Sequence, residues 1–315
     1  MDRTTEARCL YSEAFFLSPF LRTKKRTPML GVTVGDPAGV GPELVREAIR
    51  RMGRSYQLRL IGESAGVCVG RPTLNGARMA LEALQESVRL LKSGEIAGVV
   101  NGPVSKEWLR RVGFQFPGQT EFYAKAFGMK GSEVTMMMIG PRLRVALVST
   151  HLSLKTAVST LSKGGIVRAG VHLVETLRRL GFRRPRIAVC GLNPHGGEGG
   201  LFGNEERKVV EPAVRELSKK LGLKVWGPDS PDTVFWRAGK GEFDGVVALY
   251  HDQGLIPAKL LDFESTVNVT AGLPVVRCSP DHGTAFALAG KGKAKADSLM
   301  AAIRLAGQLV GGGRR

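Results

Sequence analysis

Short apolar runs that lead into polar, glycine-rich loops recur along this chain, and they constrain its fold more than any other feature. Runs of this length, rich in β-branched residues, are typical of buried strands. Three of them lead to a histidine: the runs 145–150, 187–190 and 246–250 precede His151, His195 and His251. In α/β sheets, ligands bind just past the carboxyl ends of strands. Each of these histidines is therefore expected at a possible binding edge.

Two interpretations of the three histidines remain open at this point. Three neutral imidazoles, or two with a carboxylate, suit a divalent metal ion that keeps an open coordination position. Alternatively, each histidine is a loop residue that satisfies backbone groups. The chain has only 5 histidines, and 3 of them follow strand-like runs. That repetition indicates a shared metal or catalytic site. His172, within a helical pattern, is predicted to be structural.

Strand-like runs alternate with helical patterns from Met29 onward. One helix is predicted to run from the turn over 35–43 through Arg51, and others over 77–91, 161–180, 205–221 and 297–309. The runs 134–139 and 144–149 are predicted to pair. Such alternation predicts a mostly parallel sheet covered by helices. The turn over 35–43 opens a helix but lacks the glycine spacing of a dinucleotide-binding fingerprint. Residues 229–235 are expected to be a loop that enters a helix.

The amino-acid composition limits the kinds of molecule that this protein is expected to bind. The net charge is +18, yet the basic residues are dispersed and aromatic residues make up only 6%. This pattern favours a basic surface that attracts anionic substrates, and it disfavours nucleic-acid binding. The 4 cysteines show no CxxC spacing, which favours a reducing cytoplasm.

The first 28 residues differ from the rest of the chain. Their apolar stretch over 14–21 is short and interrupted, so it is not expected to span a membrane, and no later segment is expected to do so. Residues 1–28 are predicted to be a disordered extension, or the product of a mis-assigned start with Met29 as the true initiator.

Four long segments carry a resemblance to a known family. They are the turn 35–43, LNPHGGEGGLFGNEE (192–206), YHDQGLIPAK (250–259) and SPDHGTAFALAGKGKA (279–294). Together they resemble the 4-hydroxythreonine-4-phosphate dehydrogenase family across nearly all of 29–310. The resemblance implies an α/β fold of the isopropylmalate/isocitrate dehydrogenase type, with an active-site cleft between two lobes. One lobe would comprise 29–145 and 265–315, and the other, 146–264, would carry metal ligands and dimer contacts.

The resemblance also implies a role for particular residues. The metal ligands would be His151, His195 and His251, in a site completed across a homodimer interface and holding one zinc, magnesium or cobalt ion. Substrate-binding residues would be Gln119, Thr120, Lys259, Asn268 and Arg277, and the candidate catalytic residues are Lys259 and Asp252. His282, Gly283, Thr284 and Ala285 would bind NAD or NADP.

The implied reaction is metal-dependent oxidation of 4-phosphohydroxy-L-threonine, with decarboxylation to 3-amino-2-oxopropyl phosphate, in vitamin B6 biosynthesis. Two features depart from the family. Gln119 stands where a histidine is expected, and the link between Ile61 and Arg71 is short. They leave open a related dehydrogenase acting on phosphothreonate, phosphoerythronate or an aromatic cis-diol carboxylate. A non-enzymatic, basic anion-binding protein is a further alternative.

Overall fold

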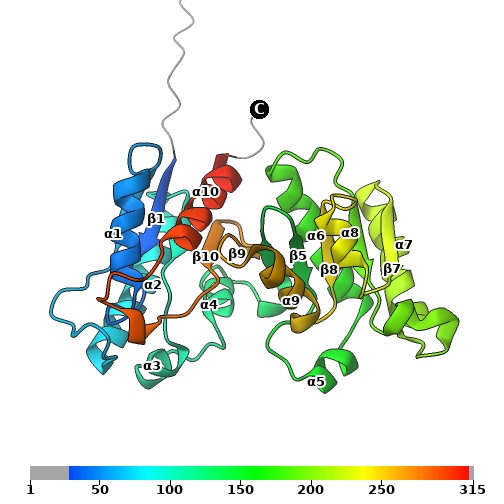
Figure 1. The fold of residues 1–315 in the computed structure, drawn as a ribbon, viewed down its shortest axis with the longest axis horizontal. Helices are drawn as coiled ribbons and strands as arrows, with labels where there is room; N and C mark the ends of the chain where they lie inside the picture. The colour runs from blue at the N-terminus through cyan, green and yellow to red at the C-terminus, as the bar shows by residue number, and fades with distance from the viewer. Residues whose placement is uncertain (1–27, 312–315) are drawn as a thin grey trace, which may run out of the picture.

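A ten-stranded β-sheet runs through the computed structural model, which describes residues 28–311 (Figure 1). Its order is β2-β1-β3-β10-β9-β4-β5-β8-β6-β7. The strands are β1 (Met29–Thr33), β2 (Gln57–Ile61), β3 (Gly98–Asn101), β4 (Thr135–Ile139), β5 (Arg144–Leu147), β6 (Ile187–Cys190), β7 (Val225–Asp229), β8 (Gly245–Ala248), β9 (Val267–Ala271) and β10 (Val276–Pro280).

Two parallel blocks make up most of the sheet. Strands β2, β1, β3 and β10 form one block, and β5, β8, β6 and β7 form the other. Between them, β9 and β4 pair antiparallel with each other and with their outer neighbours. The predicted mostly parallel sheet is thus confirmed, as is the predicted pairing of β4 with β5.

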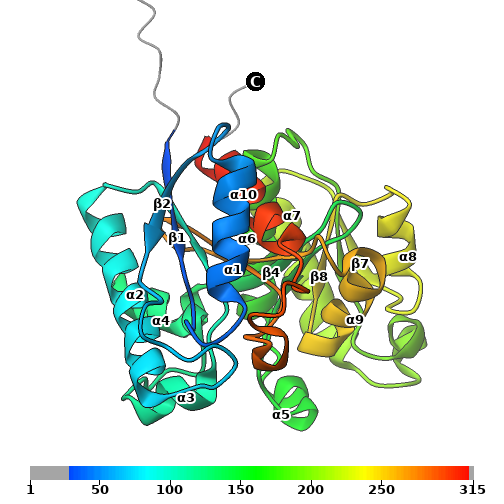
Figure 2. The same ribbon diagram turned by 60° about the vertical axis from the view of Figure 1, so that its left-hand side comes forward.

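Helices cover the sheet on both faces (Figure 2). They are α1 (Gly41–Met52), α2 (Leu74–Ser93), α3 (Lys106–Arg111), α4 (Gln119–Ala126), α5 (Leu154–Ser159), α6 (Lys163–Arg179), α7 (Glu211–Leu221), α8 (Val234–Gly239), α9 (His251–Asp262) and α10 (Asp297–Gly311). Capping residues define the ends of several helices. The Thr73 side chain caps α2 by accepting a hydrogen bond from the Gly76 N–H, and Gly94 closes that helix in the left-handed conformation.

The edge strand β7 (Val225–Asp229) is absent from the sequence prediction, which assigned no strand between the helix ending at 221 and the loop beginning at 229. Gly227 and Pro228 interrupt the strand pattern, and proline in a sheet is confined largely to edge strands. The predicted entry into a helix is confirmed by α8.

The short helix α5 was not predicted, because six residues carry too little periodicity.

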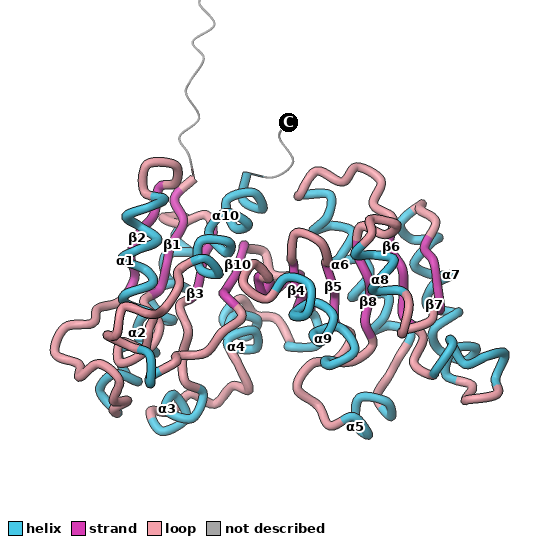
Figure 3. Tube along the Cα trace, viewed as in Figure 1, coloured by secondary structure: helices cyan, strands magenta, loops and turns pink. Residues whose placement is uncertain are grey.

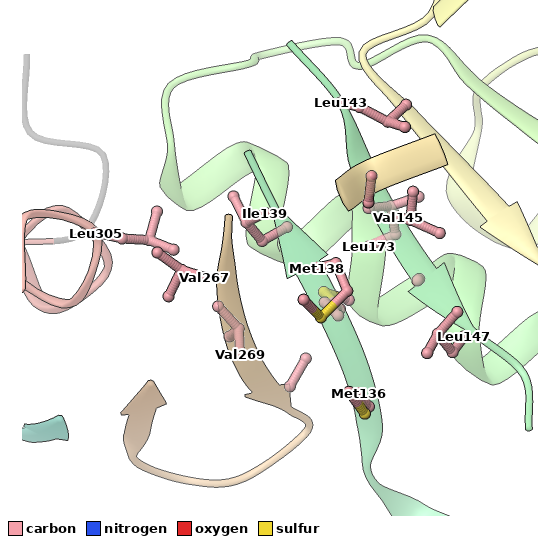
Figure 4. Packing of buried hydrophobic residues seen from close by; sticks show 14 of the residues in the cluster. Met136, Met138, Ile139, Leu143, Val145, Leu147, Leu173, Val267, Val269 and Leu305 are labelled. Carbon is pink, nitrogen blue, oxygen red and sulfur yellow. The ribbon is translucent and has the colours of Figure 1, made fainter. Parts of the chain in front are cut away.

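Apolar side chains from the middle of the sheet form the core that joins the two blocks (Figure 4). Met138 on β4, Val269 on β9 and Val145 on β5 are all buried there. Leu173 of α6 packs on the same sheet region and is fully buried. His172, beside it in the helix, places its Nδ1 2.9 Å from the Thr135 hydroxyl, which accords with the structural role predicted for it.

None of the helices within residues 28–311 combines the length and the apolar character needed to cross a membrane. The prediction for residues 1–28 falls almost wholly outside the described residues.

Candidate active site

A cavity of about 340 Å³ lies where strand ends from both parallel blocks meet. Residues just after β3 and β10 line one side, and those just after β5 and β8 line the other. Helices α3 and α5, which follow β3 and β5, lie at the same lower edge in Figure 1. The cavity brings together most of the predicted site residues: Gln119, Thr120, His151, His251, Lys259, Asn268, Arg277, His282 and Gly283.

The guanidinium of Arg277 forms the buried end of this cavity. The side chain, on β10, is 3% exposed. It donates hydrogen bonds to Asn101 Oδ1 (2.8 Å), Thr270 Oγ1 (3.3 Å) and Gln119 Oε1 (2.8 Å). All three acceptors are neutral, and burial lowers the pKa of Arg277. A buried cation without a carboxylate partner among the described residues is costly unless an anion joins it.

A second cation, Lys259 on α9, lines the same cavity. Its Nζ lies 2.9 Å from Asp281 Oδ2. Asp281 directly follows β10 and begins the loop that was predicted to bind the cofactor. The ion pair therefore ties a predicted substrate-binding residue to the predicted cofactor loop.

Helix α4 begins at the cavity with the predicted phosphate-binding residues. Gln119 and Thr120 occupy its first turn, where backbone N–H groups lack helical partners and favour anions. The Thr120 hydroxyl lies 3.2 Å from that of Thr270. Because Gln119 Oε1 accepts from Arg277, its amide nitrogen is the group left to donate to a ligand.

Two of the three predicted metal ligands face each other across the cavity. The ring centroids of His151 and His251 are 5.6 Å apart. Burial, and then the positive charges of Lys106 and His251, lower the pKa of His151, which favours its neutral, ligand form. His251 Nδ1 lies 2.6 Å from Asp252 Oδ1, which leaves Nε2 available.

The third histidine, His195, does not line this cavity. It lies in the segment between β6 and α7, which projects at the right-hand edge of Figure 3. Residues 195–199 all have positive φ, including His195 (52°) and Glu198 (41°). Among residues 28–311 of a single chain, no group of three or more His, Cys, Asp or Glu side chains is arranged to hold a metal.

Asp252, the other predicted catalytic residue, also lies outside the cavity lining. Its side chain is largely exposed and contacts His251.

The predicted cofactor loop is held in place by the turn over 35–43. The Val40 N–H donates to the Thr284 carbonyl at 2.9 Å. A Cβ at Gly39 would lie 2.6 Å from that same oxygen, so only glycine permits this approach. His282 and Gly283 line the cavity, whereas Thr284, which is buried, and Ala285 do not. His282 Nε2 is buried without a partner among the described residues.

Several lining residues were not predicted from the sequence. Asn101 and Lys106 belong to the cavity. Asn101 ends β3 and Lys106 follows shortly after it, so the strand-end signal that found the histidines also applied there. Asn268 was predicted, and its Oδ1 is buried without a partner among the described residues, which makes it a free acceptor for a ligand.

Comparison with known proteins gives consistent matches over most of the chain. The model of the family described as pyridoxal phosphate biosynthetic protein PdxA matches residues 40–306. A 4-hydroxythreonine-4-phosphate dehydrogenase of Erythrobacter litoralis is 40% identical over 322 aligned positions, covering 89% of this chain and 96% of that protein. A D-threonate 4-phosphate dehydrogenase of Cupriavidus necator is 39% identical, covering 90% and 97%.

Solved structures agree with the fold. A 4-hydroxythreonine-4-phosphate dehydrogenase from Klebsiella pneumoniae is similar with a TM-score of 0.77 and 35% identity, covering 90% of this chain and 99% of that one. An isocitrate dehydrogenase from Methylococcus capsulatus has a TM-score of 0.51 at 14% identity, covering 88% and 84%. The predicted isopropylmalate/isocitrate dehydrogenase-type fold is thereby confirmed.

Proposed function

The chain belongs to the pyridoxal phosphate biosynthetic protein PdxA family, and we propose that it oxidises 4-phosphohydroxy-L-threonine in this cavity, with NAD or NADP as the oxidant. The oxidised product is a β-keto acid, which loses carbon dioxide to give 3-amino-2-oxopropyl phosphate. The reaction needs a site that binds two anionic groups, orients a hydroxyl toward the nicotinamide and stabilises negative charge after oxidation.

The observation that carries this proposal is the buried Arg277, whose hydrogen-bond acceptors among residues 28–311 are all neutral. An arginine in that setting pairs favourably with a phosphate or carboxylate, because two oxygens of the anion can accept hydrogen bonds from two N–H groups of the planar guanidinium. Lys259 supplies a second cation in the same cavity. Lys106 is a third cation in the lining, which also contains the carboxylates of Glu121 and Asp281. A lining with more than one cation suits a substrate that carries both a phosphate and a carboxylate.

The donor set of His151 and His251 fits a divalent cation. The neutral form of His151 is favoured, and the Asp252 contact orients His251 in the manner common for metal-bound imidazoles. Such a cation would lower the pKa of a substrate hydroxyl and stabilise the ionised form. We assign the third position to His195 of a second copy, because His195 lies outside the cavity of its own chain.

Protein side chains can supply the remaining steps. Lys259 is an ammonium donor at the cavity wall, with Asp281 holding its position at 2.9 Å. It can deliver the proton that the enolate takes up after decarboxylation. The unpartnered Asn268 Oδ1 can accept from a substrate hydroxyl or ammonium. The unpartnered His282 Nε2 and the adjacent Gly283 suit contact with the dinucleotide.

A homodimer is part of this proposal, and an exposed apolar patch supports it. Ile256 (58% exposed) and Leu260 (80%) on α9 lie beside Trp236 (67%) on α8, around a groove of about 550 Å³. Large apolar side chains gathered in this way are typical of a protein interface. The groove is also lined by Asp252, next to His251. A second copy seated there would lie close to the metal ligands.

D-threonate 4-phosphate is the second candidate substrate. A relative of nearly equal identity carries that name, and the neutral Gln119 departs from the histidine expected at this position. The two acids share the phosphate and the carboxylate and differ in an amino or hydroxyl substituent. Arg277 and Lys259 would serve either one.

A substrate panel tests the proposal. The purified protein is given NAD or NADP, a divalent metal, and each phosphorylated acid in turn, and reduced nicotinamide is followed by absorbance. We expect turnover of 4-phosphohydroxy-L-threonine, its loss on adding a chelator, and carbon dioxide release matching cofactor reduction. Oxidation of D-threonate 4-phosphate alone would select the second candidate. No oxidation of either acid by metal-loaded protein would refute the proposed function.

A further inference from the structure

Arg277 is held from behind by buried side chains that lie outside the sequence motifs. Asn101 on β3 accepts from Arg277 Nε through Oδ1 (2.8 Å). Its Nδ2 contacts the Tyr123 hydroxyl on α4 (2.8 Å), and that hydroxyl contacts Ser87 Oγ on α2 (2.5 Å). Ser87 Oγ in turn donates to the Leu84 carbonyl (2.7 Å). The side chains therefore form a continuous path from α2 to the cavity.

Hydrogen-bond chemistry gives this path a single direction. The Ser87 proton is committed to the Leu84 carbonyl, so Ser87 must accept from Tyr123. The one proton of Tyr123 is thereby used, and its oxygen accepts from Asn101 Nδ2. Asn101 must then turn Oδ1 toward Arg277. The opposite amide orientation would set an N–H donor against the N–H of Arg277 Nε.

Burial makes the direction hard to reverse. Ser87, Tyr123 and Asn101 are each 0% exposed, so water cannot replace a missing partner. Burial also raises the pKa of Tyr123, which keeps its hydroxyl protonated and able to donate. Removing one hydrogen bond from this buried network leaves a polar group without a partner on each side of the missing bond.

The consequence appears at the cavity surface. With Nε fixed by Asn101, the two terminal nitrogens of Arg277 reach Thr270 and Gln119. Gln119 accepts through Oε1, so its amide turns a nitrogen donor to the ligand. Both residues then present only N–H groups at this end of the cavity.

We propose that Ser87, Tyr123 and Asn101 are a positioning relay that fixes Arg277, and through it Gln119, as a donor-only surface for an oxyanion group of the substrate. This inference rests on the proposed function and deepens it. Tyr123 and Ser87 do not line the cavity, so any effect they have on binding is transmitted through Asn101 and Arg277.

Tyr123→Phe is the main test, because it removes one hydroxyl and keeps the ring. We expect the KM for the phosphorylated acid to rise about tenfold, the loss typical of one charged hydrogen bond. The kcat and the KM for NAD should stay within about twofold of wild type, since only oxyanion binding changes. Ser87→Ala should shift the substrate KM in the same direction by a smaller factor. Tyr56→Phe is the matched control, because Tyr56 packs against Gly307 away from the cavity.

A double-mutant cycle separates positioning from general destabilisation. Arg277→Lys has no Nε for Asn101 to hold, so adding Tyr123→Phe to it should raise the substrate KM by less than about twofold. An undiminished effect of Tyr123→Phe in the Arg277→Lys background would overturn the relay. So would an unchanged substrate KM in folded Tyr123→Phe protein. If the Tyr123→Phe variant does not fold, the substrate KM is measured for the Ser87→Ala variant instead. An unchanged substrate KM in that variant overturns the proposal.

Failure of the proposed function can be told apart from failure of the relay. If the wild type oxidises neither acid, inorganic phosphate binding is measured by isothermal titration calorimetry on wild type, Tyr123→Phe and Arg277→Lys. The relay predicts that both substitutions weaken phosphate binding. Absence of phosphate binding by wild type, or equal binding by wild type and Tyr123→Phe, contradicts it.

Discussion

At the scale of single residues, the site depends on charges held where water is scarce. Arg277 is 3% exposed and has three neutral partners. The resemblance predicted it as a substrate contact, but its set of neutral hydrogen-bond partners depends on β3, β9 and α4 meeting around it. Asn101 and Tyr123 lie far from Arg277 in sequence and carry no motif, so the chain alone could not reveal the path that links them.

Replacing the nitrogen donor of Gln119 with an acceptor should weaken oxyanion binding. Gln119→Glu keeps the shape but places a carboxylate 2.8 Å from Arg277. The new ion pair would neutralise the guanidinium and present an acceptor to the ligand. We expect the KM for the phosphorylated acid to rise at least about tenfold, with little change in melting temperature. Gln85→Glu, on the exposed face of α2, is the control. An unchanged KM would argue against Gln119 as an anion contact.

His172 predicts a pH dependence of stability. Burial lowers its pKa below the ordinary 6.5, so the unfolded chain binds a proton more readily than the folded protein. Its contribution to stability is thus full above 6.5 and falls as the pH drops through that value toward the folded pKa. His172→Asn should flatten the urea-unfolding free energy across this range. An identical slope in wild type and variant would exclude His172 as the cause.

At the scale of elements, the alternation of strands and helices was predictable because each element carries its own period. The sheet order was not, since the antiparallel centre at β9 and β4 arises from pairings distant in sequence. The edge strand β7 escaped prediction because glycine and proline interrupt it. Helix α9 shows a further limit: no helix was predicted over 251–262, and nothing in the sequence indicated that Ile256 and Leu260 would be exposed.

The exposed face of α9 gives a prediction about assembly. Leu260→Asp places a charge at a side chain that is 80% exposed, so the isolated fold should tolerate it. If that face seats a second copy, burying the charge is unfavourable and the dimer should dissociate. Sedimentation or light scattering would report this, together with loss of activity. Leu74→Asp, at a 45% exposed position in the first turn of α2, should leave assembly and activity intact.

At the scale of the whole molecule, the proposed metal site requires two copies of the chain. The strand-end pattern identified all three histidines, and β5, β8 and β6, which precede them, are neighbours in the sheet. Neighbouring strands alone would suggest one shared site in one chain. The loop after β6 carries His195 away from the cavity that holds His151 and His251. Residues 195–199 of this loop all have positive φ, a conformation that the spacing of motifs did not indicate.

Complementation between two inactive variants tests whether the proposed metal site is shared between two copies of the chain. His195→Ala and His251→Ala chains are purified separately, mixed under conditions that exchange subunits, and the mixed dimers are isolated by two different affinity tags. If His195 of one copy completes the site of the other, one site in each mixed dimer has both defects and one has neither. We therefore expect the mixed dimers to have about half of the wild-type dehydrogenase activity, and either parent to have almost none. Mixed dimers as inactive as their parents would contradict it.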